Sequence, residues 1–149
     1  MRRLAVVAVA LLSAVGATVA EAAVKTYSGT TSADDPVGLK VDSKGRVYSF
    51  SFVNVHLTCS DGDEFDSGDD PVKSPTSKRY KVRKGKFKIK VREPDYGRGW
   101  DVKGKFSSKR KVVGGTFSVF ANFDSDFNPD PDGSAKCTSG VLKWSAKRK

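Results

Sequence analysis

The sequence has little of the chemistry on which enzymes and metal sites depend. His56 is the only histidine, and Cys59 and Cys137 are the only cysteines. It contains no G-x-S-x-G nucleophile elbow, no P-loop, no H-E-x-x-H zinc motif and no dinucleotide-binding glycine run. A glycosidase needs two facing carboxylates, yet Glu64 and Glu93 are the only glutamates after residue 22. We therefore expect a protein that is not an enzyme and has no catalytic residues.

Long apolar runs are also scarce, and the one at the N-terminus has the pattern of a signal peptide. Arg2 and Arg3 precede an apolar stretch, residues 4–20, that is shorter than the about 20 residues a membrane-spanning helix needs. An A-x-A site follows at Ala20-Glu21-Ala22, so we expect cleavage between Ala20 and Ala23. This predicts a signal peptide over 1–22 and a single secreted domain over 23–149 without a transmembrane segment. A retained membrane anchor is the alternative.

Both cysteines lie in the part of the chain that would be exported. In an oxidising compartment two cysteines usually form a structural bridge. A metal or catalytic role would need partner residues that a chain with one histidine does not supply. We expect a Cys59–Cys137 disulfide.

Helical periodicity is rare, and short stretches of alternating apolar residues between glycine and proline turns predict strands. These stretches cover 37–41, 48–57, 80–91, 100–106, 117–123 and 142–146. The alternation changes parity after Phe52, which predicts a β-bulge there. About seven to nine short strands favour an all-β, antiparallel β-sandwich with one disulfide, with a small β-barrel as the alternative.

Several short motifs resemble a group of small secreted bacterial β-sandwich proteins of uncharacterised function. They are Tyr27-Ser28-Gly29-Thr30-Thr31-Ser32, Cys59-Ser60-Asp61-Gly62, Gly104-Lys105-Phe106 with Gly115-Thr116-Phe117, and the ending Cys137-Thr138-Ser139-Gly140 … Trp144-Ser145-Ala146. The last has the C-x-S-G…W-x-A pattern of that group. The resemblance implies an all-β, disulfide-bridged, extracellular domain and supplies no catalytic residues.

Basic residues are concentrated between Lys78 and Arg92, where Lys84-Gly85 predicts the turn of a basic β-hairpin. Side chains at alternate strand positions share one face about 6.6–7 Å apart, so they would form a cationic stripe. The candidate residues for an anionic ligand are Lys81, Arg83, Lys86, Lys88, Lys90 and Arg92. The expected partner is an anionic cell-wall polymer, an acidic glycan or an anionic lipid surface, and export argues against nucleic acid. The alternative is a solvated face that protects a sheet edge.

Acidic residues gather in two loops, one just after Cys59 and the other just before Cys137. A disulfide would bring both loops to one rim. Oxygen ligands alternate there as they do in calcium loops, although the EF-hand pattern is absent. The candidate calcium ligands are Asp61, Asp63, Asp66, Asp126, Asn128, Asp130 and Asp132. Hydrated surface loops are the alternative.

These features lead to three hypotheses. The first is a secreted, non-enzymatic module that binds an anionic polymer or surface through the basic hairpin. The second is a calcium-stabilised extracellular module that uses the acidic rim and binds carbohydrate, with Tyr96 and Trp100 as a stacking platform unless Trp100 belongs to the core. The third is a small secreted enzyme or enzyme inhibitor. No cofactor other than calcium is indicated.

Overall fold

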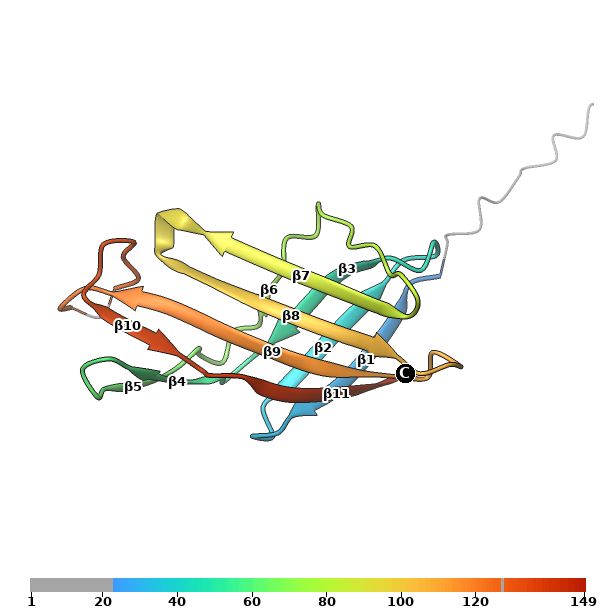
Figure 1. The fold of residues 1–149 in the computed structure, drawn as a ribbon, viewed down its shortest axis with the longest axis horizontal. Helices are drawn as coiled ribbons and strands as arrows, with labels where there is room; N and C mark the ends of the chain where they lie inside the picture. The colour runs from blue at the N-terminus through green and yellow to red at the C-terminus, as the bar shows by residue number, and fades with distance from the viewer. Residues whose placement is uncertain (1–22, 127) are drawn as a thin grey trace, which may run out of the picture.

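A computed structural model describes residues 23–126 and 128–149, and almost all of its regular structure is antiparallel β-sheet (Figure 1). The predicted signal peptide over 1–22 lies outside the described residues. The strands are β1 (Lys25–Thr31), β2 (Pro36–Val41), β3 (Val47–Phe52), β4 (His56–Cys59), β5 (Glu64–Asp66), β6 (Val72–Lys73), β7 (Lys86–Glu93), β8 (Arg98–Phe106), β9 (Val112–Phe123), β10 (Ala135–Thr138) and β11 (Leu142–Arg148). A 3-10 turn, η1 (Pro94–Tyr96), lies between β7 and β8.

All strands belong to one open sheet that branches at β9. One edge of this long strand pairs with β8, which in turn pairs with β7. The other edge pairs with β11 over Val112–Phe117 and with β10 over Phe120–Phe123. From β11 the sheet continues through β1, β2 and β3 to β6, and from β10 it continues through β4 to β5.

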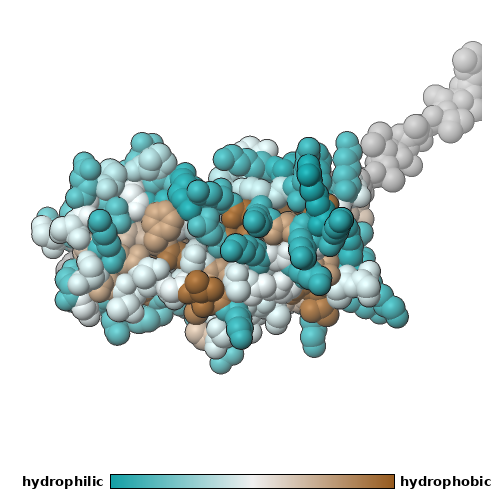
Figure 2. All heavy atoms as spheres, viewed as in Figure 1, coloured by the Kyte–Doolittle hydropathy of each residue, from teal (hydrophilic) through white to brown (hydrophobic). Residues whose placement is uncertain are grey.

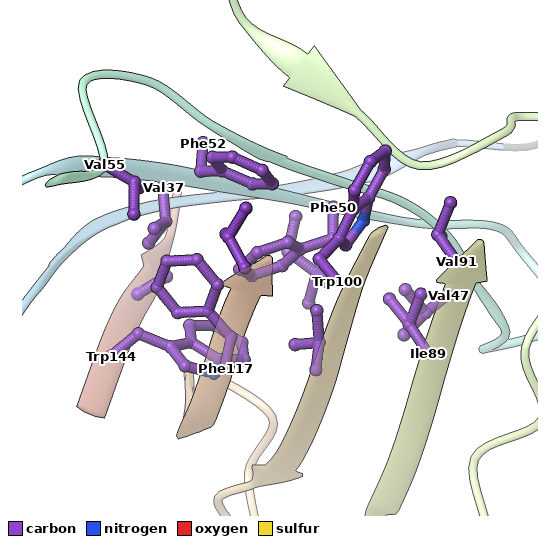
Figure 3. Close-up of a cluster of buried hydrophobic side chains, with 14 of the residues drawn as sticks. Val37, Val47, Phe50, Phe52, Val55, Ile89, Val91, Trp100, Phe117 and Trp144 are labelled. Carbon is purple, nitrogen blue, oxygen red and sulfur yellow. The ribbon is translucent and has the colours of Figure 1, made fainter. Parts of the chain in front are cut away.

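The sheet folds over so that two layers enclose the core. Figure 1 shows β7, β8 and β9 in front of β1, β2 and β3. Aromatic rings meet between the layers: Phe50 of β3 lies 5.6 Å from Phe117 of β9, and Phe52 lies 5.7 Å from Trp100 of β8, centroid to centroid. Figure 3 shows this cluster, with the rings pointing toward one another. The predicted all-β, two-layer packing is thus confirmed, and Trp100 belongs to the core at 1% exposure.

The strand count is higher than predicted because β5 and β6 contain only three and two residues. Elements this short carry no alternation that a sequence pattern could reveal. The bulge predicted near Phe52 is also wrong. There β3 ends, and Asn54 adopts a left-handed φ of 54° before β4 begins. The change of parity therefore marks a break between two strands, while the register shift occurs between Lys40 and Val41.

The predicted disulfide is confirmed. Cys59 of β4 and Cys137 of β10 lie directly opposite each other in neighbouring strands and are bonded across a sequence separation of 78 residues. In the chain-entropy model, closing a loop of this length stabilises the fold by about 4–5 kcal/mol. Within the described residues, no helix is long and apolar enough to cross a membrane.

Candidate functional site

The basic segment does not fold as the long hairpin that the sequence predicts. Lys84 and Gly85 do form a tight turn, with φ values of 49° and 74°, but only Arg83 and Lys86 pair across it. Before Arg83 the chain diverges, and Tyr80 pairs with Val47 of β3 instead. The hairpin partner of β7 is β8, joined to it through η1. This correction changes which basic side chains are neighbours.

Pairing with β8 places two lysines of β7 directly opposite two lysines of β8. Lys86 lies opposite Lys105, and Lys88 lies opposite Lys103. Together with Lys90, these residues project from the outer side of the front layer, because Phe87, Ile89 and Val91 between them are buried. We call Lys86, Lys88, Lys90, Lys103 and Lys105 the lysine face.

The backbone hydrogen bonds show how closely these lysines approach. The N–H of Lys86 donates to the Arg83 carbonyl at 2.9 Å, and the Lys86 carbonyl accepts from Arg83 at 2.8 Å. The backbone of Lys86 therefore points away from β8, so Lys86–Lys105 is a non-hydrogen-bonded pair. By alternation Lys88–Lys103 is one too. In such pairs the Cα atoms are only about 4.5 Å apart and the side chains lie closest.

None of the four opposed lysines forms an ion pair in the described part of the chain. All the ion pairs found in residues 23–126 and 128–149 use arginines or His56. Like charges directly opposite each other in a sheet are destabilising. The lysine face is thus a surface where the protein holds uncompensated positive charge. Figure 2, seen from the same side as Figure 1, shows hydrophilic residues gathered over β7 and β8.

Arg92 differs from the lysines of the same strand. Its Nη2 lies 2.7 Å from Oδ2 of Asp101, and its guanidinium carbon lies 4.8 Å from the centre of the Phe120 ring. Both contacts lie on the outer side of the sheet, and they occupy the Arg92 side chain within the protein. Of the six predicted anion-binding residues, Arg92 is therefore the one that the structure assigns to internal contacts.

A hollow of about 490 Å³ lies on this side of the sheet, between two rows of cations. One row contains Arg83, Lys86 and Lys105, and the other contains Lys88 and Lys103. Lys81 also lines the hollow. Four of the six predicted residues thus line the hollow, and Lys90 lies just beyond the second row. The structure adds Lys103 and Lys105, which sequence analysis missed.

The acidic loops lie at one end of the molecule, as predicted (Figure 1). The stacked rings of Phe65 and Phe123, 4.9 Å apart, join the strands that lead to them. Among the described residues, however, no group of three or more histidine, cysteine or acidic side chains is placed to hold a metal ion. The geometry therefore gives the calcium hypothesis no support.

The carboxylates of these loops bind backbone N–H groups instead. Oδ1 of Asp124 accepts from the N–H groups of Asp126 and Asn128, both at 2.9 Å. These hydrogen bonds, that from Asn128 first, lower the pKa of Asp124 below its ordinary value. Asp130 accepts from Asp132 at 2.7 Å in the same way, and Asp61 accepts from Asp63 at 3.2 Å. Each contact closes a local turn.

Two further surface features involve imidazole and aromatic side chains. His56 is exposed, with Nδ1 3.2 Å from Asp66 and Nε2 3.7 Å from Glu64, so it faces solvent. Tyr96 is 55% exposed and lies beneath the Arg98 guanidinium, whereas Trp100 is buried. The two rings therefore do not form an exposed platform for stacking a sugar.

No protein-family model, curated protein or solved structure matches this chain. The resemblance to small secreted bacterial β-sandwich proteins stays a prediction, and the function has to be argued from the surface itself.

Proposed function

We propose that this protein is a secreted, non-enzymatic module that binds an anionic polymer of the cell surface through the lysine face. The observation that carries this proposal is the pairing of Lys86 with Lys105 and of Lys88 with Lys103, four lysines that form no ion pair among the described residues. A face whose only task was solubility would be more stable with alternating charge signs. A bound polyanion would relieve the repulsion that the fold itself leaves in place.

The structure also supports binding through several weak contacts that are made at the same time. The cations stand on adjacent strands of a sheet whose other side is packed against the core, so their spacing is fixed by the backbone. A polyanion can meet several of them at once along about 7 Å steps of the strand. Multiple weak contacts of this kind give binding that depends steeply on salt.

Export is part of the proposal. Besides the signal-like pattern over 1–22, the Cys59–Cys137 bond supports an oxidising compartment, where disulfides persist. Cell-wall polymers and acidic glycans are the polyanions that such a compartment offers, which is why we favour them over nucleic acid.

The test is binding of the purified protein to immobilised heparin, used as a model polyanion, at increasing salt. We expect retention that falls steeply with salt. Replacing Lys86, Lys88, Lys103 and Lys105 together with glutamine should remove most of it while the melting temperature stays the same or rises.

A matched control removes the same number of charges elsewhere. Lys40, Lys44, Lys73 and Lys136 are exposed and lie outside the lysine face. Their replacement with glutamine should leave most of the retention. If the two variants elute together, retention reflects net charge alone and the lysine face has no specific role.

A further inference from the structure

We infer that the hollow between the two rows of cations is a binding site for a ring-shaped acidic saccharide unit rather than for a bare phosphate chain. This inference rests on the proposed function and specifies the class of polymer. It depends on the shape of the hollow, on where its charges stand and on what forms its floor.

The hollow is larger than a small inorganic anion needs. Its volume of about 490 Å³ falls in the range of sites that hold organic ligands, about 300–1,000 Å³. A slim polyphosphate chain could follow the lysine ammonium groups of one row and leave the space between the rows unfilled. A sugar ring would fill it.

The charges flank the hollow on both sides. Lys86 and Lys105 stand in one row, and Lys88 and Lys103 stand in the next, two residues along each strand or about 7 Å away. A ligand that uses both rows therefore needs anionic groups on opposite sides of a body that spans this gap. Uronate or sulfate groups on the two sides of a sugar ring meet that requirement.

The floor suits the apolar face of a sugar. It is formed by the chain between the rows, at Phe87, Gly104 and Gly115, and has no carboxylate. The side-chain positions of these three residues lie on the core side of the sheet, since Phe87 is buried and Gly115 pairs with the buried Trp144, so only their backbone faces the hollow. On the core side, the Lys103 carbonyl accepts a hydrogen bond from Trp144 Nε1 at 3.3 Å, which ties β8 to β11 past Gly115. The floor is thus low and fixed by the fold.

The adjoining hollow on the same side has a different character. It measures about 370 Å³ and shares Lys88, Lys103 and Thr116, but it also contains Asp101, directly opposite Lys90. A carboxylate there disfavours an anionic unit. The ring-binding position is therefore confined to the first hollow.

Thr116 offers a way to fill that hollow without changing any charge. It lines both hollows, whereas Ser118, two residues along the same strand and on the same side, lines only the second. Thr116→Trp should block the site for a ring, and Ser118→Trp is the control for adding an indole to this surface. Aromatic residues are well tolerated in strands, so both variants should fold.

The probes are a heparin tetrasaccharide and inorganic tripolyphosphate, which has no ring, titrated into each variant at one low salt concentration. We expect Thr116→Trp to weaken tetrasaccharide binding at least about tenfold, a loss of about 1.4 kcal/mol, and to leave tripolyphosphate binding nearly unchanged. Ser118→Trp should bind both probes like the parent. Melting temperatures confirm that each variant is folded.

The other outcomes separate the inference from the proposed function. The inference is wrong if Thr116→Trp binds the tetrasaccharide with the affinity of the parent, or if its affinity for both probes falls by the same factor. In either case the hollow does not select a ring, while polyanion binding by the lysine face stands. If the parent protein binds neither probe and shows no salt-dependent retention on heparin, the proposed function itself fails.

Discussion

Lys88 and Lys103 stand directly opposite each other on the exposed side of β7 and β8, as a non-hydrogen-bonded pair, and neither forms an ion pair among the described residues. Two residues further along each strand, Lys90 stands opposite Asp101. The same two strands thus contain a like-charge pair and an opposite-charge pair in adjacent rows. This contrast allows the cost of the lysine face to be measured within one hairpin.

The first prediction is that Lys103→Glu stabilises the fold. A glutamate opposite Lys88 replaces repulsion with attraction, which in cross-strand pairs amounts to about 0.2–1 kcal/mol. We expect a higher midpoint of denaturation by guanidinium together with weaker retention on heparin. Such opposite effects are the signature of a binding surface that is maintained at the expense of stability.

Lys90→Glu is the matched control, because it places a second carboxylate opposite Asp101. We expect this variant to lower the free energy of unfolding by a similar amount, about 0.2–1 kcal/mol. If Lys103→Glu destabilises the fold as much as Lys90→Glu does, the opposed lysines do not repel appreciably, and the main support for the proposed function is lost.

The second prediction distinguishes Arg92 from the lysines. Its guanidinium contacts both Asp101 and the Phe120 ring, and a cation–π contact at an exposed site contributes about 0.5–1 kcal/mol. Arg92→Ala should therefore lower the free energy of unfolding by about 1 kcal/mol and change heparin retention little. Lys88→Ala should do the reverse. Denaturant titration and salt elution of both variants check this prediction. A large loss of heparin retention in Arg92→Ala would show that Arg92 does belong to the binding surface.

Much of the fold follows from the alternation of buried residues. Phe87, Ile89 and Val91 alternate with lysines, and Trp100, Val102 and Phe106 alternate in the next strand, because each strand of the sheet has one side on the core. This local pattern is enough to assign strands and to place the cations of β7 on the outer side. The disulfide could be predicted because only two cysteines exist.

The pairing of strands could not be predicted from such patterns. The tight turn at Lys84-Gly85 indicates a hairpin, but Tyr80 packs on the core and pairs with Val47, far away in the sequence. That long-range contact draws the preceding segment away and leaves β8 as the partner of β7. Lys103 and Lys105 therefore become part of the site because β8 pairs with β7. The alternation along their strand shows only that they lie on the face away from the buried Trp100, Val102 and Phe106.

The third prediction concerns acid. Burial tends to raise the pKa of Asp42, but hydrogen bonds from the backbone and side chain of Arg46, at 2.8 Å each, outweigh burial and bring the pKa below its ordinary value. A carboxylate with a lowered folded-state pKa contributes stability that is complete above the unfolded pKa, about 3.9, and is lost as the pH falls through the folded value.

Asp42→Asn should therefore reduce stability at neutral pH and make the loss of stability in acid, below about pH 4, less steep than in the parent. Denaturant unfolding at a series of pH values measures both effects. Asp63→Asn, in an exposed loop, is the control and should leave the acid limb unchanged. An acid limb in Asp42→Asn that matches the parent would show that Arg46 does not stabilise the ionised carboxylate.

The last prediction is that calcium does not stabilise the fold specifically. A calcium ion takes 6–8 oxygen ligands, whereas Asp124 and Asp130 direct their oxygens to backbone N–H groups two or four residues ahead. These hydrogen bonds already close the local turns of the loop without a metal ion. We expect the same melting temperature in EDTA, in calcium and in magnesium, since only general screening of the acidic loops would act. A rise in calcium alone, abolished by Asp130→Asn together with Asp132→Asn, would show that the loop rearranges into a metal site.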